Sequence, residues 1–195
     1  QERCMNEYLS TLEPGDIIPA RVTHLEPFGC FVDVGCGIPS LIPIDMISVS
    51  RITHPKDRFS LGQNIHVVVK SIENGRICLS HKELLGTWQE NASMFEPGET
   101  VTGIVRSIEE YGVFVELTPN LAGLAELREG VHVNDCASVY IKAINPEKMK
   151  IKLIIVNTST ETYRDNELRY FLSSGHIDRW KYSSEESPKL IETIF

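Results

Sequence analysis

Two stretches of nine residues share one pattern: Glu26-Pro-Phe-Gly-Cys-Phe-Val-Asp-Val34 and Glu109-Glu-Tyr-Gly-Val-Phe-Val-Glu-Leu117. In each, an aromatic residue, a glycine and a variable residue precede a phenylalanine that begins an alternation of apolar and polar residues. An alternation with period two predicts a β-strand with one buried face. Because residues two apart share a face, we expect Val32 to point to the core and Phe31 to lie on the polar side with Asp33.

The two stretches belong to a tandem repeat. Pro14 and Pro97, which stand in the matching runs Leu-Glu-Pro-Gly-Asp and Phe-Glu-Pro-Gly-Glu, lie 83 residues apart. The same offset relates Phe31 to Phe114. A constant spacing across several motifs indicates a duplicated domain, and such repeats decide the interpretation of the whole chain.

Each repeat is predicted to contain five short strands, and a helical turn follows the third strand of repeat one. The expected strands are 17–25, 28–34, 40–42, 65–72 and 76–80 in repeat one, and 102–108, 113–117, 121–125, 137–144 and 149–156 in repeat two. Asn74-Gly75 is a two-residue hairpin signal, so the last two strands of repeat one should pair antiparallel. This layout predicts an all-β chain of two five-stranded OB-fold Greek-key barrels.

Five segments are expected along the chain. They are an N-terminal helix (1–12), OB domain 1 (13–82), a linking helix (83–95), OB domain 2 (96–156) and a C-terminal hairpin extension (157–195). In the extension, residues 168–172 and 177–182 flank a four-residue loop, so we expect them to pair with each other. An isolated hairpin is marginal in water, and we expect its aromatic residues to pack on repeat two.

Composition excludes several classes of protein. The net charge of −8 argues against sequence-blind binding to duplex nucleic acid but leaves room for a local basic groove. The five cysteines include no C-x-x-C pair, so we expect reduced thiols and a cytoplasmic location. We also expect no signal peptide and no membrane span, since no run reaches ~20 apolar residues.

The recurring residues resemble the S1 RNA-binding domain family, which is named after a large RNA-binding protein of the bacterial small ribosomal subunit. The resemblance covers about residues 13–156, and the two-repeat arrangement is similar to S1-like RNA-binding proteins of Firmicutes. The matching runs are Phe28-Gly-x-Phe-Val32, Ser40-Leu41, Gly75-Arg-Ile-Cys-Leu-Ser80, Gly103-x-Val105, Tyr111-Gly-x-Phe-Val115, Gly123-Leu124 and Lys150-Ile-Lys-Leu153.

The resemblance implies an OB barrel that binds single-stranded RNA across its second and third strands. It places Phe28 and Phe31 at the family's two stacking aromatic positions and Arg76 at a phosphate-contacting basic position. Pro43 and Glu126 replace a histidine of the family's third strand. The resemblance thus implies that Pro43 removes a donor from repeat one and that Glu126 puts a carboxylate where a phosphate would pass in repeat two.

The chemistry of these residues supports the same use, because a base can stack on any aromatic ring and charged side chains then hold the backbone. Phe31 and Phe114 could instead pack across strands, and Phe28 and Tyr111 lie at turns where either reading holds. The basic candidates, which could equally be solvated surface charge, are Arg76, Arg21, Lys70, His66, Arg51, His54 and Lys150. Lys150 alternates with Lys148 and Lys152, as solvent-facing lysines on an edge strand also would.

We therefore predict a non-enzymatic protein with no catalytic residues, no cofactor and no metal site, since the histidines lack metal-ligand spacing and no nucleophile-base constellation is visible. Its partner is expected to be single-stranded RNA (mRNA or rRNA), bound mainly by domain 1, in translation or RNA metabolism. An alternative is a protein-interaction module that docks on the ribosome or an RNA-processing complex through acidic domain 2 and the C-terminal hairpin. A third is a regulatory appendage of an RNA-processing enzyme whose catalytic part lies upstream of Gln1.

Overall fold

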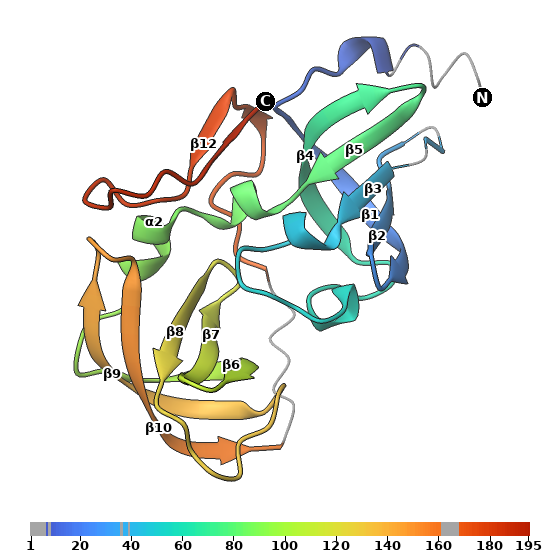
Figure 1. Cartoon of the computed structure of the whole chain (residues 1–195). Helices are drawn as coiled ribbons and strands as arrows, with labels where there is room; N and C mark the ends of the chain where they lie inside the picture. The colour runs from blue at the N-terminus through green and yellow to red at the C-terminus, as the bar shows by residue number, and fades with distance from the viewer. Residues whose placement is uncertain (1–6, 8, 36, 39, 161–167) are drawn as a thin grey trace. The chain divides into compact units, whose positions relative to one another are not determined.

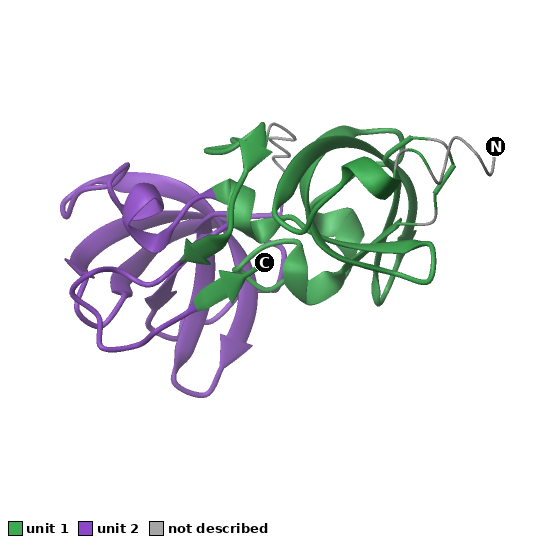
Figure 2. Cartoon of the chain, turned by 90° about the horizontal axis from the view of Figure 1, so that it is seen from above, with its two compact units in different colours: residues 1–85, 166–181, 192–195 green, residues 86–165, 182–191 purple. Residues whose placement is uncertain are grey.

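The computed structural model describes residues 7, 9–35, 37–38, 40–160 and 168–195. The chain forms two compact units, coloured green and purple in Figure 2. Unit 1 comprises Gln1–Leu85, Asn166–Lys181 and Glu192–Phe195, and unit 2 comprises Gly86–Asp165 and Tyr182–Ile191. Cys30, Cys78 and Cys136 are free thiols, and no helix of the described residues is long and apolar enough to cross a membrane.

Unit 1 contains a closed barrel of five strands (Figure 1). They are β1 (Asp16–Glu26), β2 (Gly29–Asp33), β3 (Ser40–Pro43), β4 (Asn64–Glu73) and β5 (Arg76–Ser80). β1 pairs antiparallel with both β2 and β4, and β3 pairs in parallel with β5, which closes the barrel. The inward side chains of each alternation, such as Val32 at 3% exposure, form the core, as the sequence predicts.

Unit 2 contains the second barrel, with the same order of strands. They are β6 (Thr100–Glu109), β7 (Gly112–Thr118), β8 (Leu121–Ala125), β9 (Cys136–Asn145) and β10 (Lys150–Ser159). The register repeats as well: Val22 pairs with Val32 and Val105 with Val115, and a β-bulge follows in each first strand. The prediction of an all-β fold with two OB-type barrels is confirmed.

Short helical segments connect the strands of unit 1 and lead into unit 2. The 3-10 helix η1 (Ile44–Met46) follows β3, and η2 (Pro55–Asp57) precedes β4. The expected linking helix over 83–95 is two separate pieces, η3 (Lys82–Leu85) and α2 (Trp88–Ala92). It is interrupted because Thr87 begins a new helix with a capping box, in which its hydroxyl accepts from the Glu90 amide.

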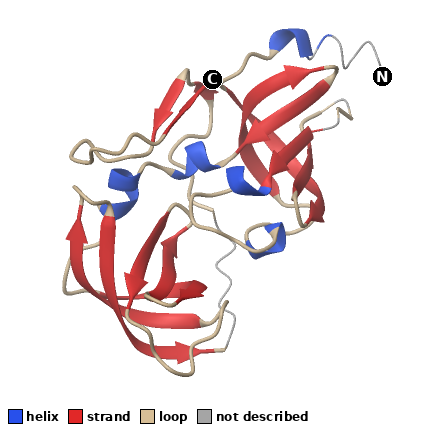
Figure 3. Cartoon of the chain, in the orientation of Figure 1, coloured by secondary structure: helices blue, strands red, loops and turns tan. Residues whose placement is uncertain are grey.

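Of the expected N-terminal helix over 1–12, Glu7 and residues 9–11 are helical, and residues 1–6 and 8 lie outside the described part of the chain. The C-terminal extension contains β11 (Gly175–His176), β12 (Arg179–Lys181) and β13 (Glu192–Ile194), shown among the red strands of Figure 3.

The predicted C-terminal β-hairpin is confirmed, and its predicted second strand, 177–182, contains β12, but its predicted first strand is wrong. Residues 168–172 form no strand; β11 pairs with the start of β1, and β12 pairs with β13. The expectation that the aromatic tail packs on repeat two is also wrong for Tyr170, which packs against unit 1 with Leu172, Ile177 and Phe195. These side chains cover Ile17, Val68 and Leu84, an apolar patch that the barrel alone would leave in water.

A buried polar pair explains why Tyr170 belongs to unit 1. The His81 imidazole donates from Nδ1 to the Ile47 carbonyl at 2.6 Å, which leaves Nε2 to accept from the Tyr170 hydroxyl at 2.8 Å. His81 is fully buried, and burial lowers its pKa to about 4. The tail therefore satisfies a neutral histidine that the sequence alone does not mark as needing a partner.

Candidate nucleic-acid interface

Two rings stand at the start of β2 in unit 1. Phe28, which is 57% exposed, meets Phe31 edge to face, with ring centroids 5.9 Å apart and an interplanar angle of 83°. Gly29 between them allows β2 to approach β3, because a Cβ on Gly29 would lie 2.5 Å from the Ile42 carbonyl oxygen. The sequence motif thus holds two perpendicular rings at the barrel surface.

Phe31 belongs to a row of side chains that crosses the outer face of the barrel. His24, Phe31, Leu41, Cys78 and Ser71 are successive cross-strand neighbours on β1, β2, β3, β5 and β4. None of the five is buried. The His24 ring contacts Phe31 edge to face at 6.2 Å. The outer row therefore offers a ring, an aliphatic side chain and small polar groups side by side.

An open pocket of about 520 Å³ adjoins Phe31. Its lining includes Thr23, His24 and Asp33 from the two first strands and Ser40 from β3. Small-molecule pockets of ~300–1,000 Å³ are typical of ligand sites, so this one has room for a base. The predicted face is confirmed: Phe31 lies on the outer side with Asp33, and Val32 points into the core.

Two of the basic candidates lie around the outer row, and a third lies off it. Arg76 is exposed at the start of β5, on the face it shares with Cys78, and it lines a second open pocket with Leu41 and Ser71. Arg21 is exposed beside Asp33, its cross-strand neighbour. Lys70 is half-buried, and its Nζ contacts the Met46 sulfur at 3.6 Å, so it lies off the row.

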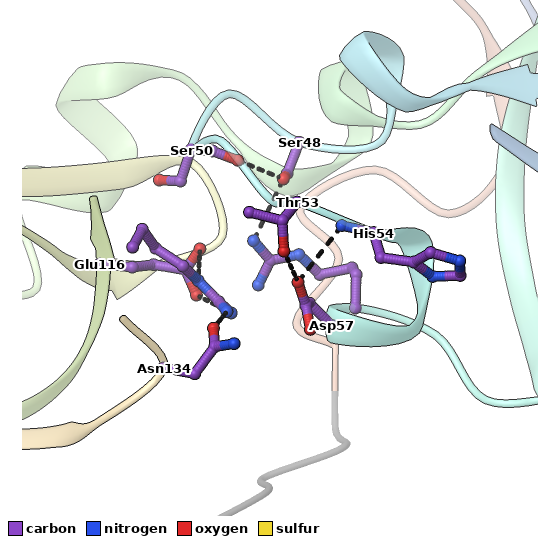
Figure 4. A network of polar contacts seen from close by, with 9 residues as sticks. Ser48, Ser50, Thr53, His54, Asp57, Glu116 and Asn134 are labelled. Carbon is purple, nitrogen blue, oxygen red and sulfur yellow. Dashed lines mark hydrogen bonds and ion pairs between the residues drawn. The ribbon is translucent and has the colours of Figure 1, made fainter. Parts of the chain in front are cut away.

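The other basic candidates of unit 1 are not brought to the rings. His66 packs beneath the tail, with its ring 5.0 Å from that of Tyr170. His54 caps η2: its Nδ1 accepts from the Lys56 amide at 3.1 Å, and its own amide donates to Asp57 (Figure 4). Arg51 is exposed in the same loop. The geometry gives His54 a structural task and leaves Arg51 at the surface.

Unit 2 repeats the two rings with a different surround. Tyr111 is 68% exposed and meets Phe114 at 6.0 Å and 85°. The row that crosses Phe114 continues through Leu124 to Lys152, where unit 1 has Cys78. Lys150 stands at the start of β10, in the place that Arg76 takes in β5. Unit 2 therefore also has an outer row with two rings, which we call the second platform, and this row has more lysine than the row in unit 1.

A buried ion pair lies beside Phe114. Arg106 donates from Nη2 to Glu116 Oε2 at 3.3 Å and from Nη1 to the Asn134 amide oxygen at 3.2 Å (Figure 4). Both side chains of the pair are nearly buried, at 7% and 5% exposure. In the repeat, Arg106 and Glu116 occupy the positions of Thr23 and Asp33, which line the pocket of unit 1.

The sequence patterns did not single out His24, although it is the cross-strand neighbour of Phe31 in the outer row. The reason is the bulge at Thr23, which breaks the alternation of β1 and moves His24 opposite Phe31. A bulge cannot be read from a single strand. The matching bulge at Arg106 is likewise visible only in the pairing of the strands.

Fold and surface define a protein of two OB-type barrels, each with an aromatic outer face. Residues 11–82 match the model of the S1 RNA binding domain family. The chain therefore contains an S1 RNA-binding domain in unit 1, and the resemblance seen in its sequence is confirmed.

Relatives extend the likeness beyond residues 11–82. The small ribosomal subunit protein bS1 homolog of Bacillus subtilis (strain 168) is 32% identical over 191 residues, which cover 94% of this chain and 44% of that protein. The small ribosomal subunit protein bS1 of Staphylococcus aureus (strain COL) is 34% identical over 130 residues, covering 65% of this chain and 33% of that protein. The chain spans less than half the length of these relatives.

Among solved structures, a multidomain protein with nucleic acid binding domains from Streptococcus pneumoniae TIGR4 overlaps 80% of this chain and 57% of its own. The overlap has a TM-score of 0.35 and 17% sequence identity, which is too low to bear on function.

Proposed function

We propose that the chain is a non-enzymatic RNA-binding protein that holds single-stranded RNA on the outer face of its barrels, mainly that of unit 1. The observation that carries the proposal is the pair of perpendicular rings, Phe28 and Phe31, beside an open pocket in an S1 domain. A core would not expose Phe28 to 57%, and an exposed aromatic pair is the surface that unstacked bases recognise.

In this proposal the rings and the charged groups have separate tasks. One base stacks on Phe28 or Phe31, worth ~1–3 kcal/mol per base, and sequence tolerance follows because every base has a π-face. Arg76 and Arg21 attract the phosphates from either side of the row. Thr23, His24 and Asp33 line the pocket and supply donors and acceptors to a base edge.

The cellular context is proposed from the relatives. Two of them are named as small ribosomal subunit proteins, so we place this chain in translation or RNA metabolism in the cytoplasm, with mRNA, rRNA or the ribosome as partner. The alternative function, docking on a protein partner through acidic domain 2 and the C-terminal hairpin, is less well supported. Tyr170 and Trp180 of the tail are already packed within unit 1, so they are not at hand for a partner.

The test is a titration of fluorescein-labelled single-stranded RNA, a 20-residue oligouridylate, across a salt series. We expect micromolar or tighter binding, weakening as salt rises, and a loss of at least tenfold for Phe31→Ala. Leu61→Ala is the matched control, because Leu61 is 67% exposed in unit 1 but lies outside the row. A folded Phe31→Ala variant that binds like the control would overturn the assignment to unit 1.

A further inference from the structure

We propose that the outer face of the β9–β10 ribbon in unit 2 is a further surface for single-stranded RNA. The ribbon face is defined by Tyr140, Lys142, Lys150, Lys152 and Ile154, all of them exposed. The inference rests on the proposed function, that this chain binds RNA. It extends the row of Phe114, Leu124 and Lys152 to a further aromatic residue, Tyr140.

The ribbon face is exposed because the described residues of unit 2 include no cover like the one on unit 1. Val68 pairs with Ile17 in β4 and β1, and tail residues bury it completely. Tyr140 pairs with Thr100 in the same register of β9 and β6, yet it is 38% exposed, and its neighbour Ile154 is 45% exposed.

Two glycines at equivalent positions of the repeats show the same difference in cover between the units. A Cβ on Gly15 would lie 2.0 Å from the Ile177 carbonyl oxygen of the tail. At Gly98, its counterpart in the repeat, a Cβ would meet nothing within 4 Å in the described chain. The place that the tail fills on unit 1 is therefore open on unit 2.

Positive charge is concentrated on the β9–β10 ribbon. Between residues 136 and 159 stand Lys142, Lys148, Lys150 and Lys152, and the only acidic residue there is Glu147. This ribbon belongs to a chain whose net charge is −8. A local run of lysines on an acidic protein focuses attraction for an anion on one strip of the surface.

The ribbon face continues the platform of the two rings. Lys152 is the neighbour of Leu124, which is the neighbour of Phe114, and Ile154 and Tyr140 form the next row. With strands ~4.8 Å apart and residues ~3.4 Å apart along a strand, three strand spacings and a step of two residues lead from Phe114 to Tyr140, a diagonal path of about 16 Å. A single strand of RNA can follow such a path with bases on the apolar groups and phosphates on the lysines.

RNA fits this face better than a protein partner does. Lysine is depleted in protein–protein interfaces, whereas lysines beside an aromatic ring are the combination that binds single-stranded nucleic acid. Tyr140 offers a flat ring for a base, and Lys142 and Lys152 flank it on the same outer side.

The test uses the full chain and the same oligouridylate. Tyr140→Ala should weaken binding about threefold to fivefold through lost stacking, whereas Tyr140→Phe should keep it. Lys142→Gln, which lies outside the row of Phe114, should make the slope of log K against log salt shallower by about 0.7, the release expected for one phosphate contact on a single strand. Leu190→Ala and Lys189→Gln, exposed in unit 2 outside the ribbon, are the matched controls and should change neither quantity.

The outcomes separate the two proposals. If the unaltered chain does not bind the oligouridylate, the proposed function fails. If it binds and Phe31→Ala weakens it, while the ribbon variants behave like their controls, the ribbon proposal is overturned and the proposed function stands. Ribbon variants that keep full RNA binding but lose a protein ligand would likewise overturn it and make the face a protein surface.

Discussion

The two barrels hold the same pair of rings but differ in what lies next to the second ring. Beside Phe31 are Thr23 and Asp33, short side chains that leave a pocket of about 520 Å³. The matching positions beside Phe114 carry Arg106 and Glu116, which reach each other and are nearly buried. The same backbone thus yields a ligand-sized recess in one unit and an internal ion pair in the other.

The barrels differ again along their last two strands. In unit 1 the face next to Val68 is covered by the C-terminal tail, and in unit 2 the corresponding face is open and rich in lysine. The comparison teaches that the repeated motif determines where the rings lie, whereas the residues around the motif determine what else the surface can bind. A shared aromatic motif is therefore no measure of equal function.

The largest effect is expected from breaking the ion pair of unit 2. Glu116→Ala leaves the Arg106 guanidinium buried without its carboxylate, which should cost about 3–5 kcal/mol in the free energy of unfolding. Asp33→Ala, the matched change in unit 1, should cost less than about 1 kcal/mol because Asp33 is exposed. Denaturant unfolding followed separately in each unit measures both.

Each unit has its own tryptophan for this measurement, Trp180 in unit 1 and Trp88 in unit 2. Trp88→Phe and Trp180→Phe backgrounds therefore isolate the fluorescence of one unit at a time. Equal losses for Glu116→Ala and Asp33→Ala would mean that the ion pair contributes nothing that a surface carboxylate does not.

The next largest effect is expected at acid pH, where unit 1 should lose more stability than unit 2. Burial holds the pKa of His81 at about 4, below its ordinary 6.5. The unfolded chain therefore takes up a proton that folded unit 1 does not, and unit 1 loses stability as pH falls from 6.5 to about 4. The loss approaches about 3 kcal/mol.

Unit 2 is the internal control for this acid effect. Since Leu79 and Leu153 hold equivalent places in β5 and β10, Ile155 stands where unit 1 has His81, and it does not titrate. Unfolding followed by the fluorescence of Trp180 should therefore shift with pH between 6.5 and 4.5 much more than unfolding followed by Trp88. Parallel shifts in both signals would show that His81 does not set the acid stability of unit 1.

The sequence predicted most of the architecture because the fold depends on local signals that recur. The alternation after Gly29, the Asn74-Gly75 turn and the constant offset between repeats are each readable in the chain, and each appears in the structure. The face of Phe31 followed from its spacing to Asp33 alone. These are short-range properties of a strand.

Long-range partners could not be predicted in this way. Tyr170 reaches His81 across 89 residues, and no periodicity in the tail encodes that contact. Arg106 stands at the bulge of β6, from which its guanidinium reaches Glu116 on β7. Contacts made by a tail or a bulge depend on the completed barrel, so they are absent from any local pattern.

The difference in RNA affinity between the Phe31 and Phe114 variants should be smaller than the differences in stability between the two barrels. Phe31→Ala should weaken oligouridylate binding at least tenfold, and Phe114→Ala about threefold, because the recess beside Phe31 holds more of a base than the filled site beside Phe114 does. Anisotropy titrations at one salt concentration measure both, with Leu61→Ala as control. Equal losses would indicate that the recess adds nothing to stacking.

The smallest effect concerns β11, a sixth strand that pairs with the barrel of unit 1. The His176 imidazole lies between Asp16 Oδ1 at 2.6 Å and Asp178 Oδ1 at 2.9 Å, where β11 joins β1. Hydrogen bonds to these carboxylates raise the pKa of His176 above 6.5, and hydrogen bonds from the Glu13 amide and His176 lower the pKa of Asp16 below 3.8. The contribution of His176 is complete below pH 6.5 and disappears as pH rises through its raised pKa. That of Asp16 is complete above pH 3.8 and disappears as pH falls through its lowered pKa.

Pairing of β11 with β1 should therefore be strongest between about pH 4 and 6.5 and weaken above that range. Hydrogen exchange of the Ile177 amide, which donates to the Gly15 carbonyl at 2.9 Å, reports it after correction for the intrinsic rate. The Tyr182 amide, which donates to the Ile191 carbonyl within unit 2, is the control. A ratio of the two protection factors that does not fall between pH 6 and 8.5, or that falls equally in His176→Asn, would show that the strand is held by backbone pairing and the packing of Tyr170 alone. The tail would then be a fixed part of unit 1 at every pH, and its cover over Val68 would not depend on protonation.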